Sequence, residues 1–267
     1  MTRRLALPER RHWLADFARL APRPWTAMTV LGVVTGAALC GGCASYQDVP
    51  TDRGAVRSTP MTTGDLAQTD INRMATLGMR ANLESLYRLA DKLYKRNPRE
   101  WRKSGAASQA QAMAQLRAAV EGRRTLTDLK ALRDVRALSL SLDPAFQGDR
   151  VAAFIFSLSD TIITAHGGST VFYLSDGLDA QRIYNAARNV EIAAWLLASR
   201  QDTAGHPLLL ANEIAEVRNV SFEREFGKIV GRLDLLAEML DEKFRRAGIG
   251  YVQNLLGAQF LQFLPVR

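Results

Sequence analysis

From residue 64 onward, apolar residues recur at intervals of three and four, the spacing of one face of an α-helix. Between Met79 and Tyr94 this spacing predicts a long amphipathic helix. The pair Asn97–Pro98 ends it, because the residue before a proline avoids the α conformation. A short basic connector follows, and the stretch from 106 to 120, rich in alanine and glutamine, predicts a second helix.

The next two apolar segments predict helices of different character. Apolar residues at three-residue intervals from Leu126 to Leu138 predict a third helix, which ends near Asp143–Pro144. Residues 151–165 form the most hydrophobic segment after residue 43. They are fewer than the ~20 residues that a bilayer-spanning helix needs, and they include Asp160, so we predict a helix in the centre of the core.

Two longer helices are predicted in the last third of the chain. After a glycine-rich break at 167–168, Asp176 is the expected N-cap of a helix whose inward face runs from Ile183 to Leu197. Another helix covers the region from Phe222 to Leu240, where apolar residues alternate in steps of four and three. Gly248 and Gly250 are expected to end it. Residues 251–264 then form an apolar helix or tail that we expect to dock on the bundle, the alternatives being contact with a membrane or a partner.

Because strand signals are nearly absent, the predicted fold class is all-α, an irregular bundle of about six to eight helices. Residues 64–267 are expected to form a single α-helical domain. Residues 43–63 lack periodicity and contain proline, glycine, serine and threonine, which indicates a flexible tether.

The first 42 residues have the composition of a secretory signal peptide. Residues 28–42 are apolar and uncharged, and six arginines precede them. The segment Leu39-Cys40-Gly41-Gly42-Cys43 resembles the lipobox of bacterial lipoproteins, although Cys40 occupies the position where that family usually has leucine. The resemblance implies cleavage between Gly42 and Cys43 and acylation of Cys43. It also implies delivery to the outer membrane, on its periplasmic face, since Ala44 is not the aspartate that retains such proteins in the inner membrane. The alternative is a short anchor helix or a buried amino-terminal helix of a cytosolic protein.

Charge and cysteine content exclude several classes of function. From residue 43 onward the chain has 29 basic and 25 acidic residues, a net charge of +4 that is spread along the sequence. This is not the concentrated basic surface of a nucleic-acid-binding protein, so no nucleic-acid partner is expected. Cys43 is the one cysteine in that region, which excludes an intramolecular disulfide and a cysteine metal site there.

No catalytic, metal-binding or nucleotide-binding motif is present in the sequence, so we expect no cofactor, no metal and no enzymatic activity. Only His166 and His206 follow residue 43, and they are forty residues apart. Asp160 is expected to be buried and to pair with an arginine from a neighbouring helix. The alternative is a helical envelope hydrolase with scattered catalytic groups, for which Asp160, Asp176 and His166 are the first candidates.

Two features favour an interaction role. Gly227 and Gly231 have the Gly-x-x-x-Gly spacing that lets another backbone approach a helix closely, although intramolecular packing is the usual use in a water-soluble helix. The segment 92–101 resembles a segment of uncharacterised proteobacterial lipoproteins. Its side chains are candidates for contact with an acidic partner or phospholipid headgroups, the alternative being a solvated helix end. These candidate residues are Lys95, Arg96, Arg99 and Trp101.

Together these features predict a lipoprotein anchored in the outer membrane that presents a helical binding or scaffolding domain to an envelope component. The expected partners are the membrane, through the lipid, and an envelope protein. A carrier of an apolar ligand held between the helices is a further alternative.

Overall fold

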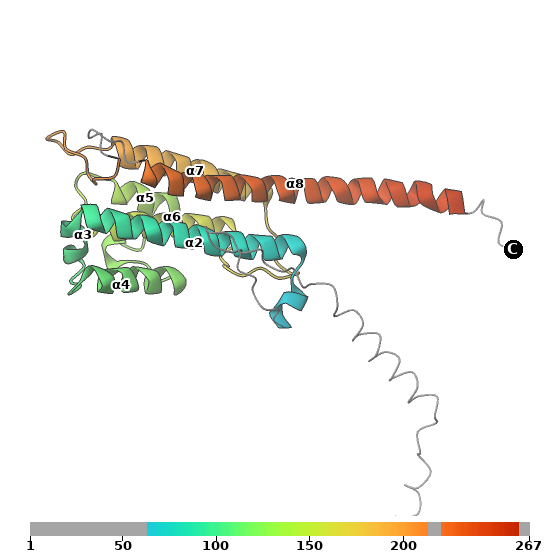
Figure 1. The fold of residues 1–267 in the computed structure, drawn as a ribbon, viewed down its shortest axis with the longest axis horizontal. Helices are drawn as coiled ribbons and strands as arrows, with labels where there is room; N and C mark the ends of the chain where they lie inside the picture. The colour runs from blue at the N-terminus through green and yellow to red at the C-terminus, as the bar shows by residue number, and fades with distance from the viewer. Residues whose placement is uncertain (1–62, 213–219, 262–267) are drawn as a thin grey trace, which may run out of the picture. The chain divides into compact units, whose positions relative to one another are not determined.

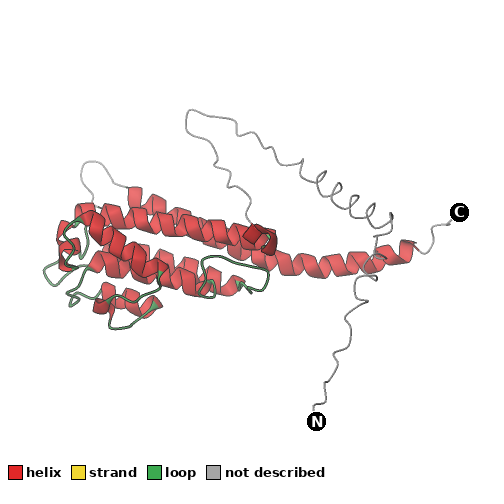
Figure 2. Ribbon diagram, turned by 90° about the horizontal axis from the view of Figure 1, so that it is seen from below, coloured by secondary structure: helices red, strands yellow, loops and turns green. Residues whose placement is uncertain are grey.

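The computed structural model describes residues 63–212 and 220–261. The predicted signal peptide, the acylation site Cys43 and most of the predicted tether lie outside these ranges. The described residues contain seven α-helices and no strand beyond an isolated bridge between Gln201 and Pro207, so the all-α prediction is confirmed (Figures 1 and 2). The helices are α2 (Asp70–Arg96), α3 (Pro98–Lys103), α4 (Gln109–Glu121), α5 (Asp134–Ser141), α6 (Arg150–Ala165), α7 (Ala180–Ser199) and α8 (Ser221–Leu261), with short 3₁₀ turns at Thr63–Ala67 and Thr127–Leu129.

Helix α6 is the centre of the core, as its composition predicts. Every residue from Arg150 to Ile163 is buried, because α2, α3, α4, α5 and α7 all pack against this helix. Asp149 caps its first turn by accepting a hydrogen bond from the Ala152 amide at 3.0 Å. Within the described ranges, no helix has the length and apolar content needed to cross a membrane.

Helix α2 agrees with the predicted amphipathic helix and begins earlier. Thr69 is its N-cap, with a hydroxyl that accepts from the Asn72 amide at 3.2 Å. The helix ends at Arg96, as predicted from Asn97–Pro98. The predicted connector after it is the short helix α3, in which Pro98 occupies the first turn.

The single helix predicted from Leu126 to Leu138 is wrong. The chain forms a 3₁₀ turn, passes through positive φ angles of 50° at Lys130 and 61° at Ala131, and only then enters α5. This break places Arg133 and the backbone amide of Asp134 against Asp160 of α6. A buried carboxylate requires such partners, and periodicity alone does not reveal that requirement.

Two predicted helix boundaries are also wrong. The N-cap of α7 is Asp179, which accepts from the amides of Gln181 and Arg182, whereas Asp176 accepts from the Tyr173 amide in the preceding loop. Helix α8 continues through Gly248 and Gly250. Neither glycine has the positive φ angle of a glycine that terminates a helix, and each lowers helix propensity by only ~1 kcal/mol.

The first half of α8 forms the predicted apolar seam against the bundle, with α7 and α2 as its neighbours. All six residues of the seam are buried: Phe222, Phe226, Ile229, Leu233, Leu236 and Leu240. The second half of α8 runs on past the end of α2 (Figure 1). Tyr251 and Leu255 are exposed there, so the expected docking of this region on the bundle is wrong for these two residues.

Candidate functional site: a groove between α7 and α8

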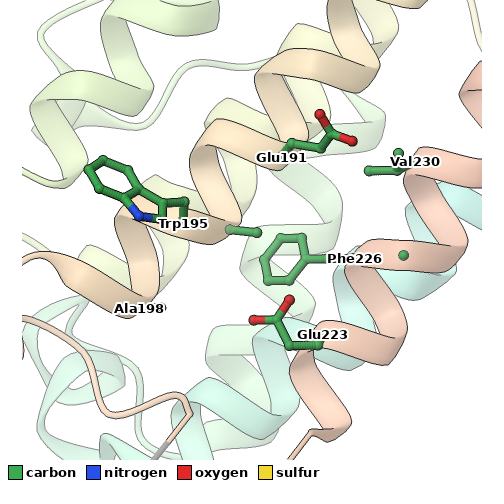
Figure 3. A pocket seen from close by; sticks show the side chains of 8 residues that line it. Glu191, Trp195, Ala198, Glu223, Phe226 and Val230 are labelled. Atoms are coloured by element: carbon green, nitrogen blue, oxygen red, sulfur yellow. The ribbon is translucent and has the colours of Figure 1, made fainter.

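A hollow of about 400 Å³ lies between α7 and α8 (Figure 3). One wall comes from α7 and the other from the first turns of α8, and Phe226 points from α8 towards α7. We call this feature the α7–α8 groove. Its lining residues are Glu191, Ala194, Trp195 and Ala198 on α7, and Glu223, Phe226, Gly227 and Val230 on α8.

Small residues create the groove. Ala194 and Ala198 are four apart on α7, and Gly227 on α8 has no side chain, so the surface between the two helices is only partly filled. Phe226 is buried beneath it as part of the α8 seam. The groove therefore has an apolar floor that the bundle's own packing holds in place.

Gly227 and Gly231 are exposed, and a Cβ atom added to either would meet nothing within 4 Å. The alternative for these candidate interaction residues, close packing within the chain, is not seen among the described residues. A glycine inside a helix costs about 0.5–1 kcal/mol relative to alanine, and here no close packing within the described chain offsets that cost. The two glycines leave a bare strip of α8 backbone beside the groove, where another chain has room to approach.

Trp195 is the largest exposed apolar side chain at the groove, with 67% of its surface accessible. It belongs to a stripe on α7 that also includes Tyr184 and Ile192, both exposed and separated by helical intervals that place all three on one side of α7. Scattered apolar residues are normal on protein surfaces, but a stripe of them along a groove is typical of a binding surface.

Carboxylates lie on either side of the apolar floor. Figure 3 shows Glu191 and Glu223 flanking the ring of Phe226. Arg188 is 3.3 Å from Glu191 and also binds Asp234 of α8 at 2.7 Å, while Glu223 accepts a hydrogen bond from the Asn212 side chain at 2.5 Å. The groove thus combines an apolar centre with acidic edges, which favours a ligand that carries cationic groups beside an apolar one.

The predicted basic segment does not line this groove. Lys95 pairs with Asp91 at 2.7 Å within α2, Arg99 is exposed at the start of α3, and the Arg102 guanidinium lies 5.0 Å from the half-buried Trp101 ring. Arg96 is half-buried in the last turn of α2. These contacts stay within one end of the bundle and agree with the alternative interpretation, a helix end with cations near its carboxyl terminus.

Asp160, His166 and Asp176 have separate partners. Asp160 binds Arg133 through two hydrogen bonds of 2.5 and 3.1 Å and lies 3.4 Å from Arg123, which confirms the predicted arginine pairing. Burial opposes its ionisation, but the hydrogen bonds from Arg133 and the Asp134 amide, with the two positive charges, hold the pKa of Asp160 below its usual value.

Burial lowers the pKa of His166, although the contact between its Nδ1 and the Ile162 carbonyl oxygen at 2.8 Å opposes that shift. Asp176 accepts a hydrogen bond in its loop, as described above. Among the described residues, no group of three or more histidine, cysteine, aspartate or glutamate side chains could hold a metal ion. The arrangement thus gives these three side chains structural partners and does not join them in one cluster.

Sequence reasoning missed Trp195. The inward face of α7 was predicted from Ala194 and Leu197, and this leaves the tryptophan between them on the outer side. A large aromatic residue off the core face was the available signal. No family model, curated protein or solved structure matches the chain, so the interpretation of the groove rests on its geometry.

Proposed function

We propose that this protein is an outer-membrane lipoprotein that binds a helical segment of an envelope protein in the α7–α8 groove. Acylation of Cys43 would hold the helical domain on the periplasmic face. The lipobox-like segment supports the anchor, and the exposed Trp195, on the α7 side of the groove that Gly227 lines from α8, carries the binding role. Tryptophan is enriched among the residues that dominate binding energy at protein interfaces.

The groove has the chemistry to receive an amphipathic helix with basic flanks. The glycine strip allows the backbone of a second helix to approach α8 closely, as small residues do at other contacts between helices. Apolar side chains of that helix would contact Phe226 in the groove and Trp195 at the outer edge of α7, while lysine or arginine at either side would meet Glu191 and Glu223.

The anchor is tested by membrane fractionation of wild type and Cys43→Ser in a Gram-negative host, with mass analysis of the amino terminus. We expect an acylated terminus at residue 43 in the outer-membrane fraction of the wild type only. An intact terminus at Met1 or Met28, or no difference in fractionation between the two chains, would overturn the anchor.

The groove is tested with a fluorescein-labelled amphipathic helical peptide that has leucines on one face and lysines at both flanks. Its anisotropy is measured as detergent-solubilised full-length protein is added. Trp195→Ala should weaken binding about 30-fold, the loss typical of a central interface residue. Gly227→Leu should weaken it as well, because the new side chain fills the bare strip.

Matched controls lie on α4, where Ala110 and Glu121 are exposed. Ala110→Leu repeats the small-to-large change and Glu121→Lys repeats a charge reversal, and both should bind the peptide as the wild type does. Glu191→Lys combined with Glu223→Lys should abolish binding. Equal binding of a peptide with glutamates in place of the lysines, or no binding to the wild type, would refute the proposed partner chemistry.

A further inference from the structure

The second half of α8 has an exposed apolar face. We call residues 241–261 the C-terminal arm; as a helix it is about 30 Å long. From Arg245 to Leu255 every residue is exposed except Gly250, which is half-buried. Tyr251 has 73% of its surface accessible. Residues 247–266 of the sequence include no charged residue. A segment of this composition normally has a non-aqueous neighbour.

The exposed apolar residues of the arm share one side of the helix. At about 100° per residue, Ile249, Tyr251, Val252 and Leu255 fall within an arc of about 160°. The opposite side has Gly250 and Asn254 and, in the first two turns of the arm, the exposed Lys243 and Arg246, of which Arg246 pairs with Glu242 at 2.9 Å. Asp241 and Arg245 fall on the apolar side in those same turns, so the uncharged apolar face begins at residue 247. Beyond residue 247 the arm is therefore amphipathic with a wide apolar face, and its first turns have three cations and two carboxylates, a net charge of +1.

The width of this face indicates what covers it. A partner helix would need a narrow apolar seam. The seam that packs α8 against its own bundle continues in the arm at Ala247 and Asn254, which are too small or too polar to form an apolar seam. A lipid interface accepts a half-circumference of apolar surface and attracts cations at its edge through anionic headgroups. We propose that the C-terminal arm lies in the interface of an anionic membrane, as an attachment separate from Cys43.

The position of the arm fits this attachment. Ile71, in the first turn of α2, lines a hollow of about 460 Å³ together with Leu235, Met239 and Arg246 of α8. The chain therefore enters the domain beside the point where the arm leaves it. If Cys43 is acylated as proposed above, the segment that joins it to the domain leads to this same end. One membrane surface can then accommodate both attachments.

The test measures the depth of single residues, so acylation does not affect it. Nitroxide labels are placed by Val252→Cys, Leu255→Cys, Gly250→Cys and Asn254→Cys in the full chain, with Cys40 and Cys43 both replaced by serine. The proteins are mixed with vesicles of phosphatidylethanolamine and phosphatidylglycerol. Power-saturation electron paramagnetic resonance then compares the access of oxygen, which concentrates in lipid, with that of a water-soluble nickel complex.

We expect oxygen access to exceed nickel access at 252 and 255 and the order to reverse at 250 and 254. A label at Ala110→Cys on α4 should report water throughout. Nickel access dominant at all four arm positions would overturn the proposal, as would spin–spin broadening at 252 and 255, which would indicate a second copy of the chain as the neighbour. Because these chains lack Cys43, failure of the arm is distinguishable from failure of the lipid anchor.

Discussion

Replacing Asp160 with alanine tests whether the buried ion cluster is structural. The carboxylate is 3% exposed and receives hydrogen bonds from Arg133 at 2.5 and 3.1 Å and from the Asp134 amide at 3.1 Å, with Arg123 at 3.4 Å. These contacts join α6 to the start of α5 and to the turn after α4. Asp160→Ala therefore removes one charge from a site that holds three segments of the chain together.

The expected loss follows from the exposure of the partners. Removing one member of a buried ion pair costs about 3–5 kcal/mol when the other charge stays buried. Here the side chains of Arg133 and Arg123 are 36% and 35% exposed, so both can regain water, and the loss should be near the lower limit, about 3 kcal/mol. The Asp134 amide also loses its acceptor. Against a typical total of about 5–15 kcal/mol, this is a large change.

Urea unfolding of the full chain measures this loss as a lower midpoint at an unchanged slope. The control is Asp176→Ala, which removes one hydrogen bond from a half-buried loop residue and should cost about 1 kcal/mol or less. A loss below about 1 kcal/mol for Asp160→Ala would refute the structural role. It would also return Asp160 to consideration as a catalytic group.

Three further changes probe the buried Asp149 and Glu225 and the half-buried Gly168. Burial raises the pKa of Asp149 to about 6, so the native state keeps a proton that the unfolded chain loses near pH 4. The free energy of unfolding should therefore fall by about 3 kcal/mol as pH rises from about 4 to 6. Asp149→Asn can still cap α6 and should remove this pH dependence. A variant whose stability in urea unfolding depends on pH as that of the wild type does would contradict the argument. Gly168→Ala should cost about 2 kcal/mol in urea unfolding, because φ is +87° at this residue and the new Cβ would lie 2.6 Å from Arg123 Nη1. The control is Gly177→Ala, where a Cβ has open space around it. Equal stabilities of the two variants would contradict the argument. Although burial opposes it, hydrogen bonds from Lys228 and Arg88 lower the pKa of Glu225 to about 2, so Glu225→Gln should cost about 1 kcal/mol at pH 7. This cost should shrink as pH falls from about 4.5 through 2, and a cost at pH 2 as large as at pH 7 would contradict the argument.

Local pattern was sufficient for the helices whose apolar faces are simple. The spacing from Phe222 to Leu240 predicts a buried seam, and the composition of 151–165 predicts a helix in the core; in the structure both are buried. Pattern failed where a distant residue controls the backbone. The turn between Lys130 and Asp134 has left-handed residues and ends on Asp160, a contact with a residue 26 positions away from the Asp134 amide.

By itself, the sequence of this protein determined that it is helical, which residues avoid water, and that Gly227 and Gly231 share one side of a helix, because these properties depend on composition and on a period of 3.6 residues. Only the tertiary structure decided what covers each face. It placed α7 against α8 so that Trp195 and Gly227 line one groove, and it left the C-terminal arm extending beyond α2. A helical face in isolation does not specify its neighbour, since burial is a property of the packed chain and not of any one segment.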